Sequence, residues 1–265
     1  MRAIFWKDLK LTRKGLYAWL ATMLLTASMG AAEYPMMSQN MDMLMPTFEM
    51  LPKIVRIMFG VEGLTFQQPL DYYITMYFWY SLIIFTHAAY VGATIIAKEE
   101  RDKTAEFLFA KPHKRSEIIS AKIMVGVFHV LSMAFFVWLF TVVILLPLFD
   151  GESILGIISI TMVGMFLTQL VFLGLGLLCT AFFRKYKTGL NAAMLIVLAS
   201  FAIAVILEYL GNVDYLNFLS PFRYFTVRTV ISEGISLLYI LIAAVIMAVS
   251  IYLTYGFYNK RDLLI

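Results

Sequence analysis

Six long apolar runs decide what this chain can fold into. They lie approximately at residues 16–32, 72–97, 118–148, 154–183, 189–210 and 235–257. A bilayer core about 30 Å thick takes roughly 20 helical residues at about 1.5 Å each, so every run is a candidate membrane span. Charged residues make up only 14% of the chain, against about 25% in an average soluble domain. The sequence therefore predicts an all-α polytopic membrane protein with six transmembrane helices in a single domain, residues 1–265.

The first run has a second interpretation. Its basic start, apolar stretch and small residues Gly30, Ala31 and Ala32 are also typical of a cleaved signal peptide. The amphipathic, aromatic segment before the run favours a retained helix.

The basic residues fall unevenly between the two sides of a six-span chain. With six spans, both termini lie on one side, and that side holds all but four of the 21 Lys and Arg. The four on the opposite side are Lys53, Arg56, Arg223 and Arg228. Because cytoplasmic loops carry the positive excess, both termini are predicted to be cytoplasmic. This asymmetry explains the net charge of +4 without a nucleic-acid partner.

A charged block follows the second run. Twelve charged residues lie between Lys98 and Lys122, too many for hydrocarbon, so this part of the chain is expected in water or against another protein. Asp102 is a candidate N-cap and Pro112 a stop signal for a short helix within a cytoplasmic loop at 98–117. A short helix with a small apolar face fits a groove on a soluble partner. The alternative is a solvated connector that rests on lipid.

Three other polar segments have helical patterns. Residues 2–14 place Ile4, Phe5 and Leu9 near one face and basic residues elsewhere, which predicts an interfacial amphipathic helix, with a simple positive-inside anchor as the alternative. Short outer helices are expected in the loops after spans one and five, the first around residues 50–58 and the second interrupted by Pro221. The thioethers of Met41, Met43 and Met45 are either ligands for a soft ion or adaptable apolar filler.

No motif of an enzyme is present in the sequence. The chain lacks a Walker A pattern, HExxH, paired CxxC and Gly-x-Ser-x-Gly, and its one cysteine, Cys179, cannot form an intrachain disulfide. We therefore expect no catalytic, cofactor or metal site on this chain. Ionisable residues within the spans are candidates for function, and His87 and His129 are tentative path residues. Glu208 lies near the outer end of the fifth span and is expected at the interface.

Taken together, the chain resembles the type-2 ABC exporter permease family. The resemblance rests on the block KEERDKTAEFLFAKPHKRSEIISAK, on the outer segments LPKIVRIMFG and LSPFRYF, and on the amphipathic start. It implies a transport subunit in a bacterial cytoplasmic membrane that works with a second permease, either a copy or a paralogue. It also implies two separate ATPase subunits, which bind ATP and Mg. Residues 2–14 correspond to the family's connecting helix.

The resemblance assigns an ATPase-coupling helix to the loop between spans two and three. Its residues in this sequence are Thr104, Ala105, Glu106, Phe107 and Leu108. The family often has a glycine near this threonine, whereas Lys103 and Ala105 flank it here.

The scarcity of intramembrane charge favours a hydrophobic or amphipathic cargo, such as a peptide, a lipid-like molecule or an antibiotic. An ABC permease for a metal-related or small ionic cargo is one alternative. An ion-gradient secondary transporter is a second, although we find no inverted repeat. A membrane-embedded enzyme is a third, and it would need convergent His, Asp or Glu within the spans.

Overall fold

The computed structural model describes residues 1–66, 68–98, 114–149, 154–183 and 185–259, and in these ranges every regular element is helical. The long helices are α1 (Arg2–Gln39), α4 (Pro69–Ile95), α7 (Arg115–Phe140), α8 (Leu155–Phe182), α9 (Tyr186–Leu210) and α11 (Leu237–Asn259). The short ones are α2 (Met41–Met50), α3 (Lys53–Phe59) and α10 (Val227–Glu233). A π-helical turn, Thr141–Leu145, and a 3-10 turn, Leu146–Leu148, extend α7.

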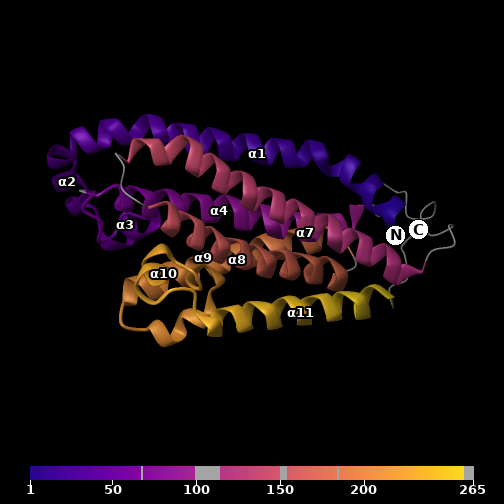
Figure 1. Ribbon diagram of the computed structural model, residues 1–265. Helices are drawn as coiled ribbons and strands as arrows, with labels where there is room; N and C mark the ends of the chain where they lie inside the picture. Colours follow the sequence, from indigo (N-terminus) through magenta and orange to yellow (C-terminus); the bar gives the residue numbers. More distant parts are fainter. Residues whose placement is uncertain (67, 99–113, 150–153, 184, 260–265) are drawn as a thin grey trace.

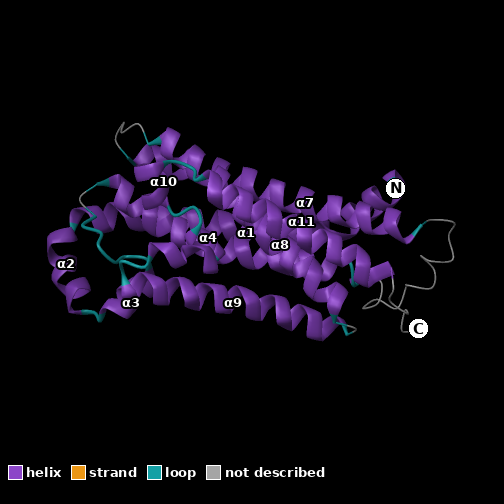
Figure 2. Cartoon of the chain, turned by 90° about the horizontal axis from the view of Figure 1, so that it is seen from below, coloured by secondary structure: helices purple, strands orange, loops and turns teal. Residues whose placement is uncertain are grey.

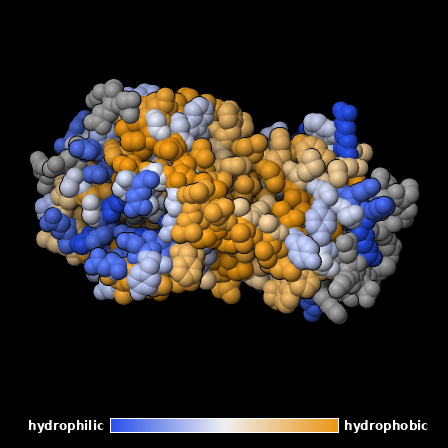
Figure 3. All heavy atoms as spheres, turned by 60° about the horizontal axis from the view of Figure 1, so that its bottom comes forward, coloured by the Kyte–Doolittle hydropathy of each residue, from blue (hydrophilic) through white to orange (hydrophobic). Residues whose placement is uncertain are grey.

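In the described part of the chain, six helices are long and apolar enough to cross a membrane, which confirms the predicted number of spans. They run side by side along one axis, with α2, α3 and α10 at one end and the start of α1 at the other (Figure 1 and Figure 2). On the face shown in Figure 3, an apolar band lies across the middle of the molecule between two more hydrophilic ends. An apolar band is the surface expected for a protein in a bilayer, because charged side chains are costly in contact with hydrocarbon.

The first helix differs from the prediction. We expected an interfacial helix at 2–14 and a separate span at 16–32, whereas α1 is one helix of 38 residues. Its length of about 57 Å exceeds the thickness of a bilayer core. Gly15 does not interrupt it, because a single glycine inside a helix costs only about 1 kcal/mol relative to alanine. Packing of Ile4 and Asp8 into the bundle holds the segment in line.

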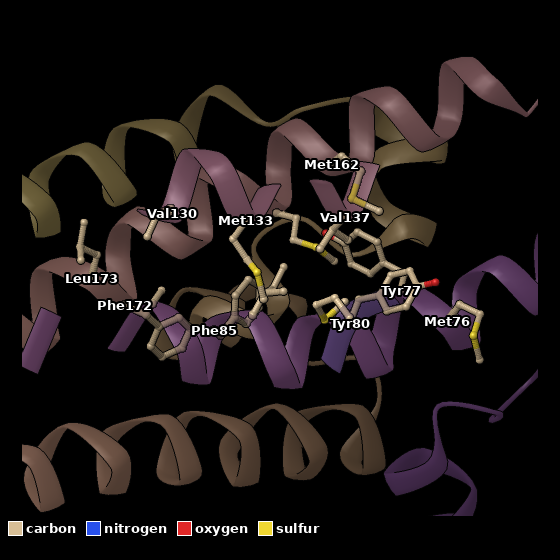
Figure 4. Packing of buried hydrophobic residues seen from close by; sticks show 14 of the residues in the cluster. Met76, Tyr77, Tyr80, Phe85, Val130, Met133, Val137, Met162, Phe172 and Leu173 are labelled. Atoms are coloured by element: carbon tan, nitrogen blue, oxygen red, sulfur yellow. The ribbon is translucent and has the colours of Figure 1, made fainter. Parts of the chain in front are cut away.

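The centre of the bundle is formed by α4 and α8, which are largely buried, while α1 and α11 are mostly exposed. Gly92 on α4 and Gly176 on α8 allow these two backbones to touch, because a Cβ atom at either position would overlap with a carbonyl of the other helix. The GxG of Gly174 and Gly176 is therefore a helix-packing feature, as expected for small residues in membrane helices. Side chains from α4, α7 and α8 fill the space beside this contact (Figure 4).

At the opposite end from the start of α1, the predicted helical stretch at 50–58 overlaps with α3, Lys53–Phe59, which is followed by a left-handed glycine, Gly60. The segment around Pro221 forms two 3-10 turns, Asp214–Leu219 and Pro221–Arg223, followed by α10. Pro221 lacks a backbone N–H and stands at the start of the second turn, where none is needed. The loop is tied to the core because the Tyr77 hydroxyl donates to the carbonyl of Phe225 at 2.7 Å.

Candidate functional site

The five residues assigned to ATPase coupling, Thr104 to Leu108, lie outside the described residues, as does 99–113 as a whole. The structure does place the two ends of this segment. The described chain after α4 ends at Lys98. It resumes at Lys114, the residue before α7. The end of α4 and the start of α7 lie at the end of the bundle where α1 begins, because Ile4 of α1 packs against Ile118 of α7 and Lys122 of α7 donates to the carbonyl of Ile95.

A buried lysine joins the helices that flank this segment. The Lys122 Nζ lies 3.5 Å from Oδ2 of Asp8 and donates a hydrogen bond of 2.9 Å to the carbonyl of Ile95. Asp8 belongs to α1, Ile95 is the last residue of α4, and Lys122 lies about two turns into α7. Both charged side chains are 1% exposed. We call these three residues the basal clamp.

Sequence reasoning missed the basal clamp. Asp8 lies within the segment expected to form an interfacial helix and Lys122 at the end of the charged block, and no partner was predicted for either residue. A usable signal was present, since an acid and a base that both face apolar neighbours on membrane helices are expected to pair.

Two of the three apolar residues of the amphipathic start contact α7, and the third packs on the main core. Ile4 is buried against Ile118 and Ala121, and the ring of Phe5 meets that of Phe128 edge to face at 6.3 Å. Leu9 packs on the main core. This face of α1 therefore has a protein partner, whereas an interfacial helix would direct it at lipid.

The two candidate path histidines are neighbours. The rings of His87 on α4 and His129 on α7 are stacked with centroids 6.4 Å apart. Both are buried, and Trp19 of α1 packs edge-on against His87 at 5.4 Å. The Nε2 of His129 lies 2.8 Å from the Thr12 hydroxyl. Helical periodicity alone gave no reason to pair these positions, which are far apart in the chain.

A cavity of about 240 Å³ lies beside the histidines, between α1, α4 and α7. We call it the histidine cavity. Neither nitrogen of His87 has a hydrogen-bond partner among the described residues, and the same holds for Nδ1 of His129. Since buried polar groups are normally satisfied, these three nitrogens are an unusual concentration of free hydrogen-bonding capacity.

A network of charges lies at the other end of the bundle. Glu208 on α9 pairs with Arg223 and lies 4.0 Å from Arg228, while Arg56 on α3 donates to Glu62 at 2.6 Å. The hydrogen bond to Glu62 raises the pKa of Arg56, and burial lowers the pKa of Arg223. The network borders a smaller cavity of about 140 Å³. Its role in the fold is to tie α3, α9 and the loop before α10 together.

The methionines of α2 do not converge. Met41 is buried, whereas Met43 is 76% exposed, because residues two apart point to different sides of a helix. In the described part of the chain, no group of three or more His, Cys, Asp or Glu is arranged to hold a metal ion.

Comparison with known families gives a match over nearly the whole chain. The model of the ABC-2 family transporter protein matches residues 2–263. A comparison with the curated proteins gives no match.

Proposed function

The chain belongs to the ABC-2 family of transporter proteins, and from this premise we propose that it is an exporter permease that moves an amphipathic cargo. A permease of this family is a membrane subunit that associates with an ATPase subunit. We further propose an assembly of two permeases and two ATPases in a bacterial cytoplasmic membrane, with ATP and Mg bound on the ATPases.

The observation that carries the proposal is that the two helices flanking the charged segment meet the start of the chain at one end of the bundle. Lys122, near the start of α7, contacts Asp8 near the start of α1 and Ile95 at the end of α4, so both flanking helices lie at the end where α1 begins. Basic residues concentrate at this end, which supports a cytoplasmic location. An ATPase in the cytosol would then meet the segment that contains Thr104 to Leu108.

The basal clamp supports a route from that segment into the membrane. Lys122 on α7 contacts both α1 and the end of α4. A displacement of either helix that flanks the segment would therefore change the contacts of the Lys122 ammonium. Closure of an ATPase dimer would then move α1, α4 and α7 together. Such movement would convert an inward-facing state into an outward-facing one. The free energy that drives it would be the difference in the binding free energy of the ATPase between those two states.

The cargo class follows from the scarcity of charge inside the bundle. Among the described residues, the buried ionisable side chains other than tyrosines and Cys179 are Asp8, Lys122, His87 and His129, and the first two already pair with each other. A small hydrophilic ion or sugar would need more polar partners than these. A hydrophobic or amphipathic molecule would not.

Substitution of Leu108 tests the docking role. We expect Leu108→Asp to abolish co-purification of the tagged permease with the ATPase and to abolish permease-stimulated ATP hydrolysis, while the permease stays folded by gel filtration in detergent. The matched control is Leu219→Asp, which places a charge on an exposed leucine at the opposite end. Normal co-purification and hydrolysis in Leu108→Asp would refute the docking role.

A further inference from the structure

The cavity at the end of the bundle opposite the start of α1 has the size of one aromatic ring. Its volume is about 140 Å³. An engineered apolar cavity of about 150 Å³ binds benzene, so the two volumes are alike. The cavity lies between α3, α4, α9 and the segment that leads into α10. We call it the distal cavity.

The distal cavity runs along α9 from an aromatic inner end to a charged mouth. Its lining residues Phe201, Val205 and Glu208 follow one another at helical spacing, so they lie on one face of α9 over about 10 Å. Glu208 stands at the mouth with Arg228, whose side chain is 45% exposed. A ligand from the surface would therefore enter with its apolar part first.

The inner walls are formed largely by aromatic rings. The ring centroids of Phe78 on α4 and Phe201 on α9 are 5.9 Å apart, and those of Phe201 and Phe222 are 5.7 Å apart. All three side chains line the cavity and remain partly exposed. Aromatic rings at such distances attract each other beyond the burial of their area. The walls therefore favour a further aromatic ring over an aliphatic chain of the same volume.

At the mouth, a donor and an acceptor face each other across a gap. Nη1 of Arg228 and Oε1 of Glu208 are 4.0 Å apart, which is too far for a hydrogen bond. Nη2 of Arg228 donates to the carbonyl of Glu62, and Oε2 of Glu208 accepts from Arg223. Nη1 and Oε1 themselves have no hydrogen bond to any described residue.

A hydroxyl group fits this gap. An oxygen about 2.8 Å from both atoms can accept a hydrogen bond from Arg228 and donate one to Glu208 at the same time. A carboxylate in this place would be repelled by Glu208, and an ammonium group would be repelled by Arg228. The mouth therefore favours a neutral polar group that both donates and accepts.

We propose that the distal cavity binds an aromatic ring that carries a hydroxyl group, with the ring beside Phe78, Phe201 and Phe222 and the hydroxyl between Arg228 and Glu208. A phenol meets this description and is neutral near pH 7, because its pKa is about 10. Naming the ligand as part of a cargo rests on the proposed transport function, whereas the existence of the site does not. The alternative is a bridging water above an unoccupied cavity.

Fluorine NMR of 4-fluorophenol makes the site observable, because the protein contains no fluorine. The full-length chain is purified in a neutral detergent and titrated with the probe. Specific binding is the line broadening that an excess of unlabelled phenol removes, because partition into detergent does not saturate. We expect such broadening in the parent and its loss in Ala204→Leu, which fills the cavity. Ala202→Leu changes an exposed alanine on the same helix and should bind like the parent.

The hydroxyl and its partners are tested separately from the ring. 4-Fluoroanisole has a methyl group in place of the hydroxyl proton and cannot donate to Glu208. Its Kd should be about tenfold higher than that of 4-fluorophenol, the factor expected for the loss of one hydrogen bond to a charged group. Arg228→Met should weaken 4-fluorophenol by the same factor and leave the Kd of fluorobenzene unchanged. Lys53→Met, which removes an exposed lysine outside the cavity at the same end, is the control.

Each part of the proposal can fail on its own. Equal Kd values for 4-fluorophenol, 4-fluoroanisole and fluorobenzene would overturn the hydroxyl assignment and leave water as the bridge. No displaceable broadening in the parent, or its persistence in Ala204→Leu, would overturn the site itself. If Ala204→Leu does not fold, Arg228→Met still decides, because an unchanged Kd for 4-fluorophenol in that variant would contradict the proposed contact.

The outcome is independent of the ATPase. The titration needs no nucleotide and no partner, so specific binding by a permease that recruits no ATPase would refute the transport function and leave the site standing. A permease that stimulates hydrolysis but does not bind 4-fluorophenol would refute the site alone.

Discussion

The ammonium of Lys122 lies 3.5 Å from the carboxylate of Asp8, and both side chains are almost fully removed from solvent. The two residues are distant in the sequence. Lys122 belongs to α7, the helix that follows the charged block, and Asp8 belongs to α1. A buried ion pair is weak grounds for stability on its own, but an unpaired charge in the same place is strongly destabilising. The pair therefore fixes the relative position of the two helices.

The first prediction concerns this pair. Asp8→Asn leaves the Lys122 ammonium buried without its counter-charge, and we expect a loss of about 3–5 kcal/mol in the free energy of unfolding. The measurement is the unfolding midpoint in detergent. Asp8→Leu combined with Lys122→Met removes both charges and should recover most of the loss. A midpoint unchanged in Asp8→Asn would contradict the prediction.

The second prediction concerns the contact between α4 and α8. Gly92→Ala places a Cβ atom into the backbone of α8 at Leu173, which no side-chain rotation relieves. We expect the purified variant to aggregate or to unfold at a clearly lower temperature than the parent. Gly156→Ala is the matched control, because nothing lies within 4 Å of its Cβ and alanine favours a helix by about 1 kcal/mol. Equal stability of the two variants would exclude the close approach.

The third prediction concerns the charge network near α3. Glu208→Gln removes one carboxylate partner of Arg223, whose side chain is 18% exposed and which keeps Asn217 at 3.1 Å and Asp214 at 3.8 Å. The loss should be about 1.5–3 kcal/mol, the contribution typical of a hydrogen bond to a charged group. Trypsin should then cleave at Arg223 or Arg228 faster than in the parent. Glu233→Gln, which changes an exposed glutamate in the same region, should leave the cleavage rate unchanged.

The fourth prediction concerns orientation in the membrane. In a Cys179→Ala background, Lys111→Cys should react with a membrane-impermeant maleimide only after cells are opened, and Glu233→Cys should react in intact cells. Cys179 is buried, so its replacement by another small residue is expected to be tolerated. Labelling of Lys111→Cys from outside intact cells would reverse the topology and remove the proposed ATPase contact.

The sequence by itself determined the number of spans and the class of fold, because hydrocarbon excludes charge and an apolar run of sufficient length has no other stable state there than a helix. It also identified the charged segment and the two intramembrane histidines. These features depend on the composition of a single stretch of chain.

Only the tertiary structure decided which stretches meet. The union of residues 2–14 with the first span depends on α7, which receives Ile4 and Asp8. The partners of Lys122 and the cavity beside His87 and His129 depend on how α1, α4 and α7 are rotated about their axes. The periodicity of each helix in the sequence is compatible with many such rotations. Close packing selects one of these rotations, through contacts between two helices such as that of Gly92 on α4 with the backbone of Leu173 on α8.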